Sequence, residues 1–121
     1  MKEMDTSVII LGIDPGIGIT GYSVLQDLGN RVEIMDYGAI RTDSKVCFPE
    51  RLCELYRCIE ELIARFHPEE LAMEELFFNK NVKTALLVGQ AMGVITLACV
   101  RNGLSITKYT PLQVKQAVAG Y

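Results

Sequence analysis

Hydrophobic residues near the N-terminus form short runs that are rich in β-branched side chains, which is the pattern of β-strands. The run at 8–13 is continuously apolar, as expected for a strand that is buried on both faces in the middle of a sheet. Further strands are predicted at 19–25 and 31–42, on either side of the turn-forming sequence Asp27-Leu28-Gly29-Asn30. This part of the chain therefore predicts a meander of three strands.

A helical period begins at Pro49, where apolar residues start to recur every three or four positions. These residues are Leu52, Leu55, Tyr56, Ile59, Leu62, Ile63 and Phe66. The predicted amphipathic helix ends before Pro68, because a proline disfavours a helical conformation in the residue that precedes it.

The rest of the chain alternates strands with helices. A short apolar strand is predicted at 71–73, a helix at 82–101, a strand at 106–109 and a final helix at 110–118. A meander supplies antiparallel strands, and helical crossovers supply parallel ones. The 121 residues are therefore predicted to form a single α/β domain in which helices flank a five-stranded mixed sheet.

The segment 84–100 has no charged residue in 17 positions and contains Gly89-x-x-x-Gly93, so a membrane helix has to be considered. A soluble helix is favoured, because the segment is at the short limit for crossing a bilayer and has Gln90 at its centre. A helix that is apolar nearly all round is either a central core helix or one that packs against a second copy of the chain. For a homodimer, the expected interface contains Leu86, Gly89, Gln90, Gly93 and Leu97.

Charge is distributed unevenly along the chain. The formal net charge of −3 taken alone argues against DNA binding, since phosphate contacts need lysine and arginine. Residues 1–75, however, hold all 15 carboxylates and seven Lys/Arg, whereas residues 76–121 hold five Lys/Arg and no carboxylate. This asymmetry favours a surface that faces a polyanion, although lysines scattered over solvated faces would give the same pattern.

The cysteines and the N-terminus indicate the cellular compartment. Cys47, Cys53, Cys58 and Cys99 form no C-x-x-C pair, so neither a zinc site nor a disulfide framework is indicated. We expect reduced, mostly buried thiols. The N-terminus has acidic residues among its first five positions and lacks the layout of a secretory signal. These features predict a cytoplasmic protein.

Two carboxylates carry the main chemical signal, because Asp14 follows the strand at 8–13 and Glu74 follows the strand at 71–73. Carboxylates at the ends of adjacent strands approach closely, since strands lie ~4.8 Å apart, and they repel unless a cation or proton lies between them. Their hard oxygen atoms suit Mg²⁺ or Mn²⁺, and such ions support phosphodiester hydrolysis. The alternative is that Asp14 only forms a side-chain turn before Pro15-Gly16 and that Glu74 only leaves the strand for solvent.

A competing signal is Gly16-Ile17-Gly18-Ile19-Thr20-Gly21, which matches the G-x-G-x-x-G motif of dinucleotide-binding proteins. That motif has to open a helix, yet the residues that follow favour a strand, so a tight hairpin is the better interpretation. A nucleotide-binding fragment is a related alternative, because sugar kinases and actin-like ATPases resemble the chain at this first hairpin. Those proteins need a second nucleotide-binding half, which 121 residues cannot provide.

Five motifs follow one another along the chain from about Val8 to Tyr121. They are Ile10-Leu11-Gly12-Ile13-Asp14-Pro15-Gly16, Thr20-Gly21-Tyr22, Glu74 with Phe77 and Asn79-Lys80-Asn81, Leu87-x-Gly89-Gln90-Ala91-x-Gly93, and Gln113-Val114-Lys115-Gln116. Taken together, these motifs resemble the RuvC family of crossover junction endodeoxyribonucleases. It implies an RNase H-like fold, Mg²⁺-dependent nicking of four-way (Holliday) DNA junctions, a homodimer built around 84–100, and cooperation with the RuvA and RuvB branch-migration proteins.

By the same resemblance, Asp14 and Glu74 match the family's first two catalytic carboxylates. Phe77 matches an aromatic residue that stacks on a base near the crossover, and Lys115 matches a basic residue near the scissile phosphate. With Lys80 and Lys83 from the basic part of the chain, they are the expected DNA-binding residues. Without the resemblance, Phe77 would be interpreted as an edge-of-core residue and Lys115 as a solvated lysine.

The family's pattern continues past the position of Tyr121 into a helix whose two aspartates complete the metal site. No Asp or Glu follows Glu75 in this sequence. We therefore expect the chain to lack that C-terminal helix, to bind Mg²⁺ weakly and to be catalytically incomplete. A dimeric DNA-binding module without chemistry is accordingly a third interpretation.

Overall fold

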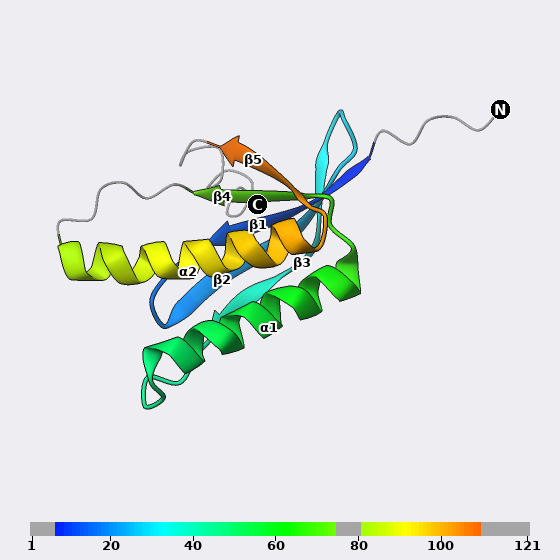
Figure 1. Cartoon of the computed structure of the whole chain (residues 1–121). Helices are drawn as coiled ribbons and strands as arrows, with labels where there is room; N and C mark the ends of the chain where they lie inside the picture. The colour runs from blue at the N-terminus through cyan, green and yellow to red at the C-terminus, as the bar shows by residue number, and fades with distance from the viewer. Residues whose placement is uncertain (1–6, 75–80, 110–121) are drawn as a thin grey trace.

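The computed structural model describes residues 7–74 and 81–109, which form five strands and two helices (Figure 1). In chain order they are β1 (Val8–Asp14), β2 (Ile19–Asp27), β3 (Val32–Arg41), α1 (Phe48–Phe66), β4 (Glu70–Glu74), α2 (Val82–Arg101) and β5 (Ser105–Tyr109). The predicted element order is confirmed as far as β5. The predicted final helix at 110–118 lies outside the described residues.

The five strands form one mixed sheet in the order β3-β2-β1-β4-β5. β1 pairs with β2 and β2 with β3 in antiparallel fashion, whereas β4 is parallel to both β1 and β5. The antiparallel meander and the parallel crossovers are both confirmed. The apolar run of β1 is explained by its position, because it is the central strand and Leu11 and Ile13 are fully buried.

The ends of α1 follow from local sequence. Pro49 lies in the first turn, where its missing N–H is not needed, and Glu50 adds a negative charge at the positive end of the helix dipole. His67 ends the helix in a left-handed conformation with φ of 53°, and its backbone N–H donates to the carbonyl of Ile63. His67 is therefore the residue that ends α1.

Both helices cover the same face of the sheet and lie side by side (Figure 1). The main hydrophobic core fills the space between them and the sheet, with Leu11, Ile59, Leu71 and Ile95 fully buried. A smaller cluster on the other face contains Ile10, Leu25 and Ala72. Because side chains alternate along a strand, Asp14 belongs to the same face of β1 as Ile10.

In the described parts of the chain, α2 alone is long and apolar enough to cross a membrane, and 28% of its most apolar 18-residue stretch is buried. Its inward residues are part of the structure's core: Val88, Ala91, Ile95, Ala98 and Cys99. The core therefore explains one side of this apolar helix, and its outward side needs a separate explanation.

The expectation that the cysteines are mostly buried is wrong, because one of the four is buried. Cys47 and Cys53 are exposed, Cys58 is half-buried and Cys99 is buried. Cys53 is not among the buried residues of α1 and lies on the side of this amphipathic helix that faces solvent. All four thiols are free, as expected, and burial raises the pKa of Cys99 to about 12.

Candidate functional site

Asp14 and Glu74 end two neighbouring parallel strands at the same edge of the sheet. The β1–β4 register pairs Ile13 with Met73, and the next residue on each strand is the carboxylate. Adjacent strands lie ~4.8 Å apart, so the backbones of these two residues are next-door neighbours. The structure therefore confirms that the fold brings the two predicted positions together.

The Asp14 side chain is exposed and accepts no hydrogen bond from any described residue. Side-chain turns do occur at Asp27, which accepts from Gly29 N at 2.9 Å, and at Asp43, which accepts from Lys45 N at 2.9 Å. Asp14 forms no such bond with a residue that the structure describes. The described residues therefore give no support to the interpretation of Asp14 as a side-chain turn, and its exposed carboxylate suits a contact with water or a cation.

The glycine-rich motif after Asp14 forms a hairpin, as predicted, because β2 begins at Ile19 and no helix follows. A Cβ on Gly16 would lie 2.2 Å from the carbonyl oxygen of Ile19, so this tight connection requires glycine. Gly21 pairs with Asp14, and a Cβ there would lie 3.6 Å from the Cβ of Asp14. The dinucleotide-binding interpretation is therefore excluded by the geometry that its motif would need.

The predicted DNA contacts are only partly visible. Lys83 is exposed in the first turn of α2, and the side chain of Asn81 caps this helix by accepting from Thr84 N at 3.2 Å. Phe77, Lys80 and Lys115 lie outside the described residues. Within 7–74 and 81–109, no three His, Cys, Asp or Glu residues gather in a way that could hold a metal ion.

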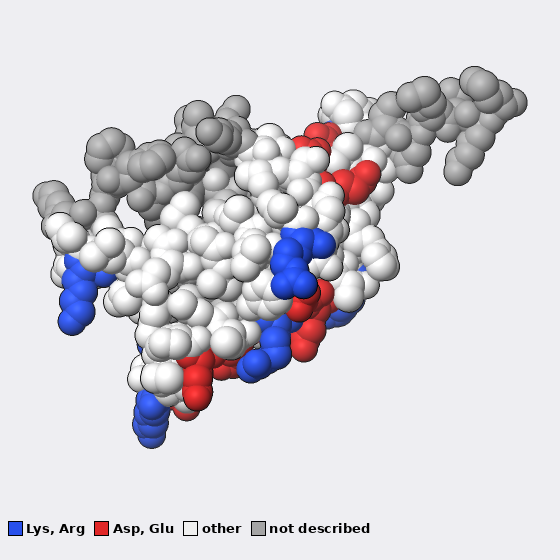
Figure 2. Space-filling view, viewed as in Figure 1, with Lys and Arg blue, Asp and Glu red and all other residues white. Residues whose placement is uncertain are grey.

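The five predicted dimer residues share the outward side of α2. Leu86 is 64% and Leu97 53% exposed, and Gly89, Gln90 and Gly93 are also exposed. Val82 and Val100 extend this stripe at both ends. Figure 2, which views the helix-covered side, shows a broad area without charged residues over α2, whereas acidic and basic side chains gather around α1.

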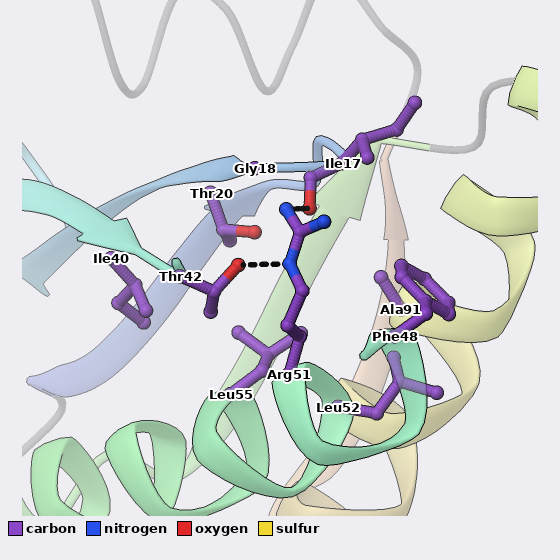
Figure 3. Close-up of a pocket in the computed structure, with 10 residues that line it drawn as sticks. All are labelled: Ile17, Gly18, Thr20, Ile40, Thr42, Phe48, Arg51, Leu52, Leu55 and Ala91. Atoms are coloured by element: carbon purple, nitrogen blue, oxygen red, sulfur yellow. Dashed lines mark hydrogen bonds between the residues drawn. The ribbon is translucent and has the colours of Figure 1, made fainter. Parts of the chain in front are cut away.

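Arg51 is a site residue that the sequence pattern did not indicate. It extends from α1 to the connection that follows Asp14, where it donates to the backbone carbonyl of Ile17 (Figure 3). A hydrogen bond to a backbone carbonyl 34 positions away leaves no signal in residue spacing. Only the assembled fold reveals this contact.

Comparison with known proteins identifies close relatives. The family described as crossover junction endodeoxyribonuclease RuvC matches residues 10–121. The crossover junction endodeoxyribonuclease RuvC of Alkaliphilus oremlandii is 54% identical over 114 residues, which cover 94% of this chain and 70% of that protein. The protein of the same name from Ruminiclostridium cellulolyticum is 53% identical, over 94% of this chain and 69% of its own length.

Solved structures agree with these matches. Thermus thermophilus RuvC in complex with a Holliday junction substrate superposes with a TM-score of 0.80 at 31% identity, over 93% of this chain and 70% of that one. The yeast mitochondrial Holliday junction resolvase Ydc2 has a TM-score of 0.66 at 18% identity, over 91% and 55%, and shares the fold alone. The predicted RNase H-like fold is therefore confirmed. The chain belongs to the RuvC family of crossover junction endodeoxyribonucleases.

Proposed function

We propose that this protein nicks four-way (Holliday) DNA junctions in a divalent-metal-dependent reaction, with Asp14 and Glu74 as ligands of the metal. The observation that carries the proposal is their placement at the ends of β1 and β4, where the strand register makes them neighbours. The relatives' name supports an endodeoxyribonuclease, and the Thermus relative was solved with a Holliday junction substrate.

The residues present fit Mg²⁺ or Mn²⁺. Asp14 offers carboxylate oxygens that are exposed and accept no hydrogen bond from the described residues, and hard oxygen ligands are those that these ions prefer. A bound divalent ion would lower the pKa of water and stabilise charge on the phosphate oxygens. Asp14 and Glu74 would hold it at one edge of the sheet.

A nicking assay separates this function from the nucleotide-binding alternative. With Mg²⁺ or Mn²⁺, the protein as its gene encodes it is expected to cut a synthetic four-way junction and to leave a linear duplex of the same arm sequence intact. ATP should not be hydrolysed in either reaction. ATP hydrolysis together with an uncut junction would favour the kinase-like or ATPase-like alternative over the nuclease.

DNA binding is proposed to use the basic part of the chain, through Lys80, Lys83 and Lys115 with Phe77 stacking on an unpaired base. Lys83 is the member of this set whose surroundings the structure describes. It is exposed, no acidic residue lies in the first turn of α2, and the chain from 76 onwards contains no carboxylate. A phosphate at this helix end would meet both a lysine and the positive end of the helix dipole.

We expect Lys83→Ala to weaken junction binding and to reduce the salt dependence of that binding. Each neutralised phosphate contributes about 0.9 to the slope of log K against log salt concentration, so the loss of one contact should lower the slope by roughly that amount. The measurement is a titration of junction DNA at several salt concentrations without metal. The control is Lys45→Ala, because Lys45 is an exposed lysine that lies outside the basic part of the chain, 76–121. An unchanged slope in Lys83→Ala would remove this lysine from the DNA contact.

The homodimer is proposed to form through the outward side of α2. This surface is uncharged from 84 to 100, and Leu86 and Leu97 are each more than half exposed. A contiguous exposed apolar surface of this kind marks an interaction site in soluble proteins. A twofold axis across α2 would bury the same residues in both copies.

Cooperation with the RuvA and RuvB branch-migration proteins and a cytoplasmic location are proposed from the family resemblance. A junction that is moved along DNA by other proteins has to be met by its nuclease in the same compartment. The free cysteines of the structure fit a reducing compartment.

A further inference from the structure

Arg51 joins three elements at the edge of the sheet where β1 ends (Figure 3). Its Nε donates to Thr42 Oγ1 at 3.1 Å, and its Nη2 donates to the carbonyl oxygen of Ile17 at 3.2 Å. Ile17 belongs to the connection 15–18 between β1 and β2, and Thr42 directly follows β3. One guanidinium in the first turns of α1 is therefore bonded both to the hairpin after Asp14 and to the end of β3.

The surroundings of Arg51 leave it little freedom. Its guanidinium carbon lies 5.8 Å from the centre of the Phe48 ring, and its Nη2 would be 3.3 Å from a Cβ added to Gly18. Thr42 N also donates to the carbonyl oxygen of Gly18 at 3.1 Å. The connection 15–18 is therefore held both by Arg51 of α1 and by the residue that follows β3. The cavity that remains among the residues drawn in Figure 3 is only about 10 Å³, which is at the lower limit for one water.

Fixing this connection matters because the Asp14 carboxylate has no hydrogen bond of its own among the described residues. Its direction is therefore set by the backbone on either side. The β1 ladder holds the backbone before Asp14, since Ile13 pairs with both Tyr22 and Met73. The backbone after Asp14 is the connection 15–18, which Arg51 and Thr42 hold.

We propose that Arg51 is a positioning residue that orients the Asp14 carboxylate for metal binding by holding the connection 15–18 against α1 and β3. This inference rests on the proposed role of Asp14 as a metal ligand. Arginine suits the task because its planar guanidinium donates in two fixed directions at once, which the single ammonium of lysine does not reproduce. Replacing a residue that orients a metal ligand without touching the metal itself commonly lowers metal affinity or activity by roughly 10–100-fold.

The test compares Arg51→Ala, Arg51→Lys and Thr42→Val with the unmodified protein as its gene encodes it. Arg57→Ala is the matched control, because Arg57 is an exposed arginine of the same helix. Two readouts do not depend on cleavage: Mn²⁺ affinity, from the electron paramagnetic resonance signal of free Mn²⁺, and hydrogen exchange of the Thr42 amide, which is bonded to Gly18, in metal-free protein. Junction affinity without metal is measured in parallel.

Both Arg51 variants are expected to weaken Mn²⁺ binding roughly 10–100-fold and to speed exchange at Thr42, with junction affinity unchanged. Thr42→Val removes one of the two bonds and should give a smaller change in the same direction. Should Arg51→Ala not fold, Arg51→Lys and Thr42→Val carry the comparison.

Folded Arg51 variants with normal Mn²⁺ affinity would overturn the inference, whether junction binding is normal or weakened; in the second case Arg51 would contact DNA directly. An Asp14→Asn protein with normal Mn²⁺ affinity would instead overturn the proposed metal site, so the two failures are distinguishable.

Discussion

Asp14→Asn is expected to slow junction nicking by more than about a hundredfold while leaving junction affinity without metal unchanged. Without this charged ligand the metal ion would be held less firmly, and a misplacement of ~1 Å at a reacting centre can already cost about a hundredfold in rate. The asparagine keeps the shape of the side chain and removes its negative charge. Because the described residues give Asp14 no hydrogen-bond partner, the substitution breaks no hydrogen bond within 7–74 and 81–109. Loss of rate with intact DNA binding would therefore report on the metal site alone. Glu74→Gln should behave in the same way.

The matched control for this experiment is Asp27→Asn. Asp27 undergoes the same chemical change at the other end of the sheet, where β2 ends opposite Val8. Its side chain accepts a hydrogen bond from Gly29 N, which asparagine also can accept in a turn. Normal cleavage is expected from this variant. Full activity in Asp14→Asn or Glu74→Gln would remove that residue from the proposed metal site.

The sequence predicts the elements of this fold well because each depends on local pattern. β-Branched runs, a change of period at Pro49 and the glycines and prolines between them lie within a few residues of the elements that they define. The β2–β3 pairing is less regular, because a register shift between Val24 and Leu25 interrupts the alternation of inward and outward residues. Such an irregularity arises from how two strands meet, so neither strand's sequence reveals it.

The candidate site was only partly predictable, because it depends on which strands become neighbours. Asp14 and Glu74 stand out as carboxylates after apolar runs, but only the parallel pairing of β1 with β4 shows that they meet. Arg51 has no sequence signal at all, since its partners are the Ile17 carbonyl and the Thr42 hydroxyl. Contacts between residues that lie far apart in the chain produce no regular spacing of residue types, so the sequence alone does not reveal them.

The two possible roles of α2 could not be separated by sequence either, because the segment 84–100 has no charged residue to mark which side faces solvent. The structure shows that both sides carry apolar residues. Ala91, Ile95 and Ala98 face the core, whereas Leu86 and Leu97 face outward. The core therefore accounts for the apolar residues on the inward side of α2, and the exposed apolar residues on its outward side support the proposed dimer.

Leu86→Glu is expected to convert the proposed dimer into monomers. Burying a leucine side chain contributes ~1.5–3 kcal/mol, and a twofold interface loses two copies, so the dimer dissociation constant should rise at least ~100-fold. Glutamate forms helices about as well as leucine, so α2 should stay folded. Sedimentation velocity across a range of protein concentrations gives the measurement. Val32→Glu on β3, which replaces another exposed apolar residue, is the control and should leave association unchanged.

The glycines of α2 sharpen this test, because their effect on the monomer and on the dimer should have opposite signs. A Cβ added at Gly89 or Gly93 meets nothing within 4 Å in the monomer, and glycine inside a helix costs about 0.5–1 kcal/mol relative to alanine. Gly93→Ala should therefore stabilise the folded monomer. If two α2 helices pack closely at these glycines, the same methyl groups would collide across the twofold axis and weaken the dimer. A monomeric unmodified protein at high micromolar concentration, or a Gly93→Ala dimer as tight as the unmodified one, would argue against close packing through this face.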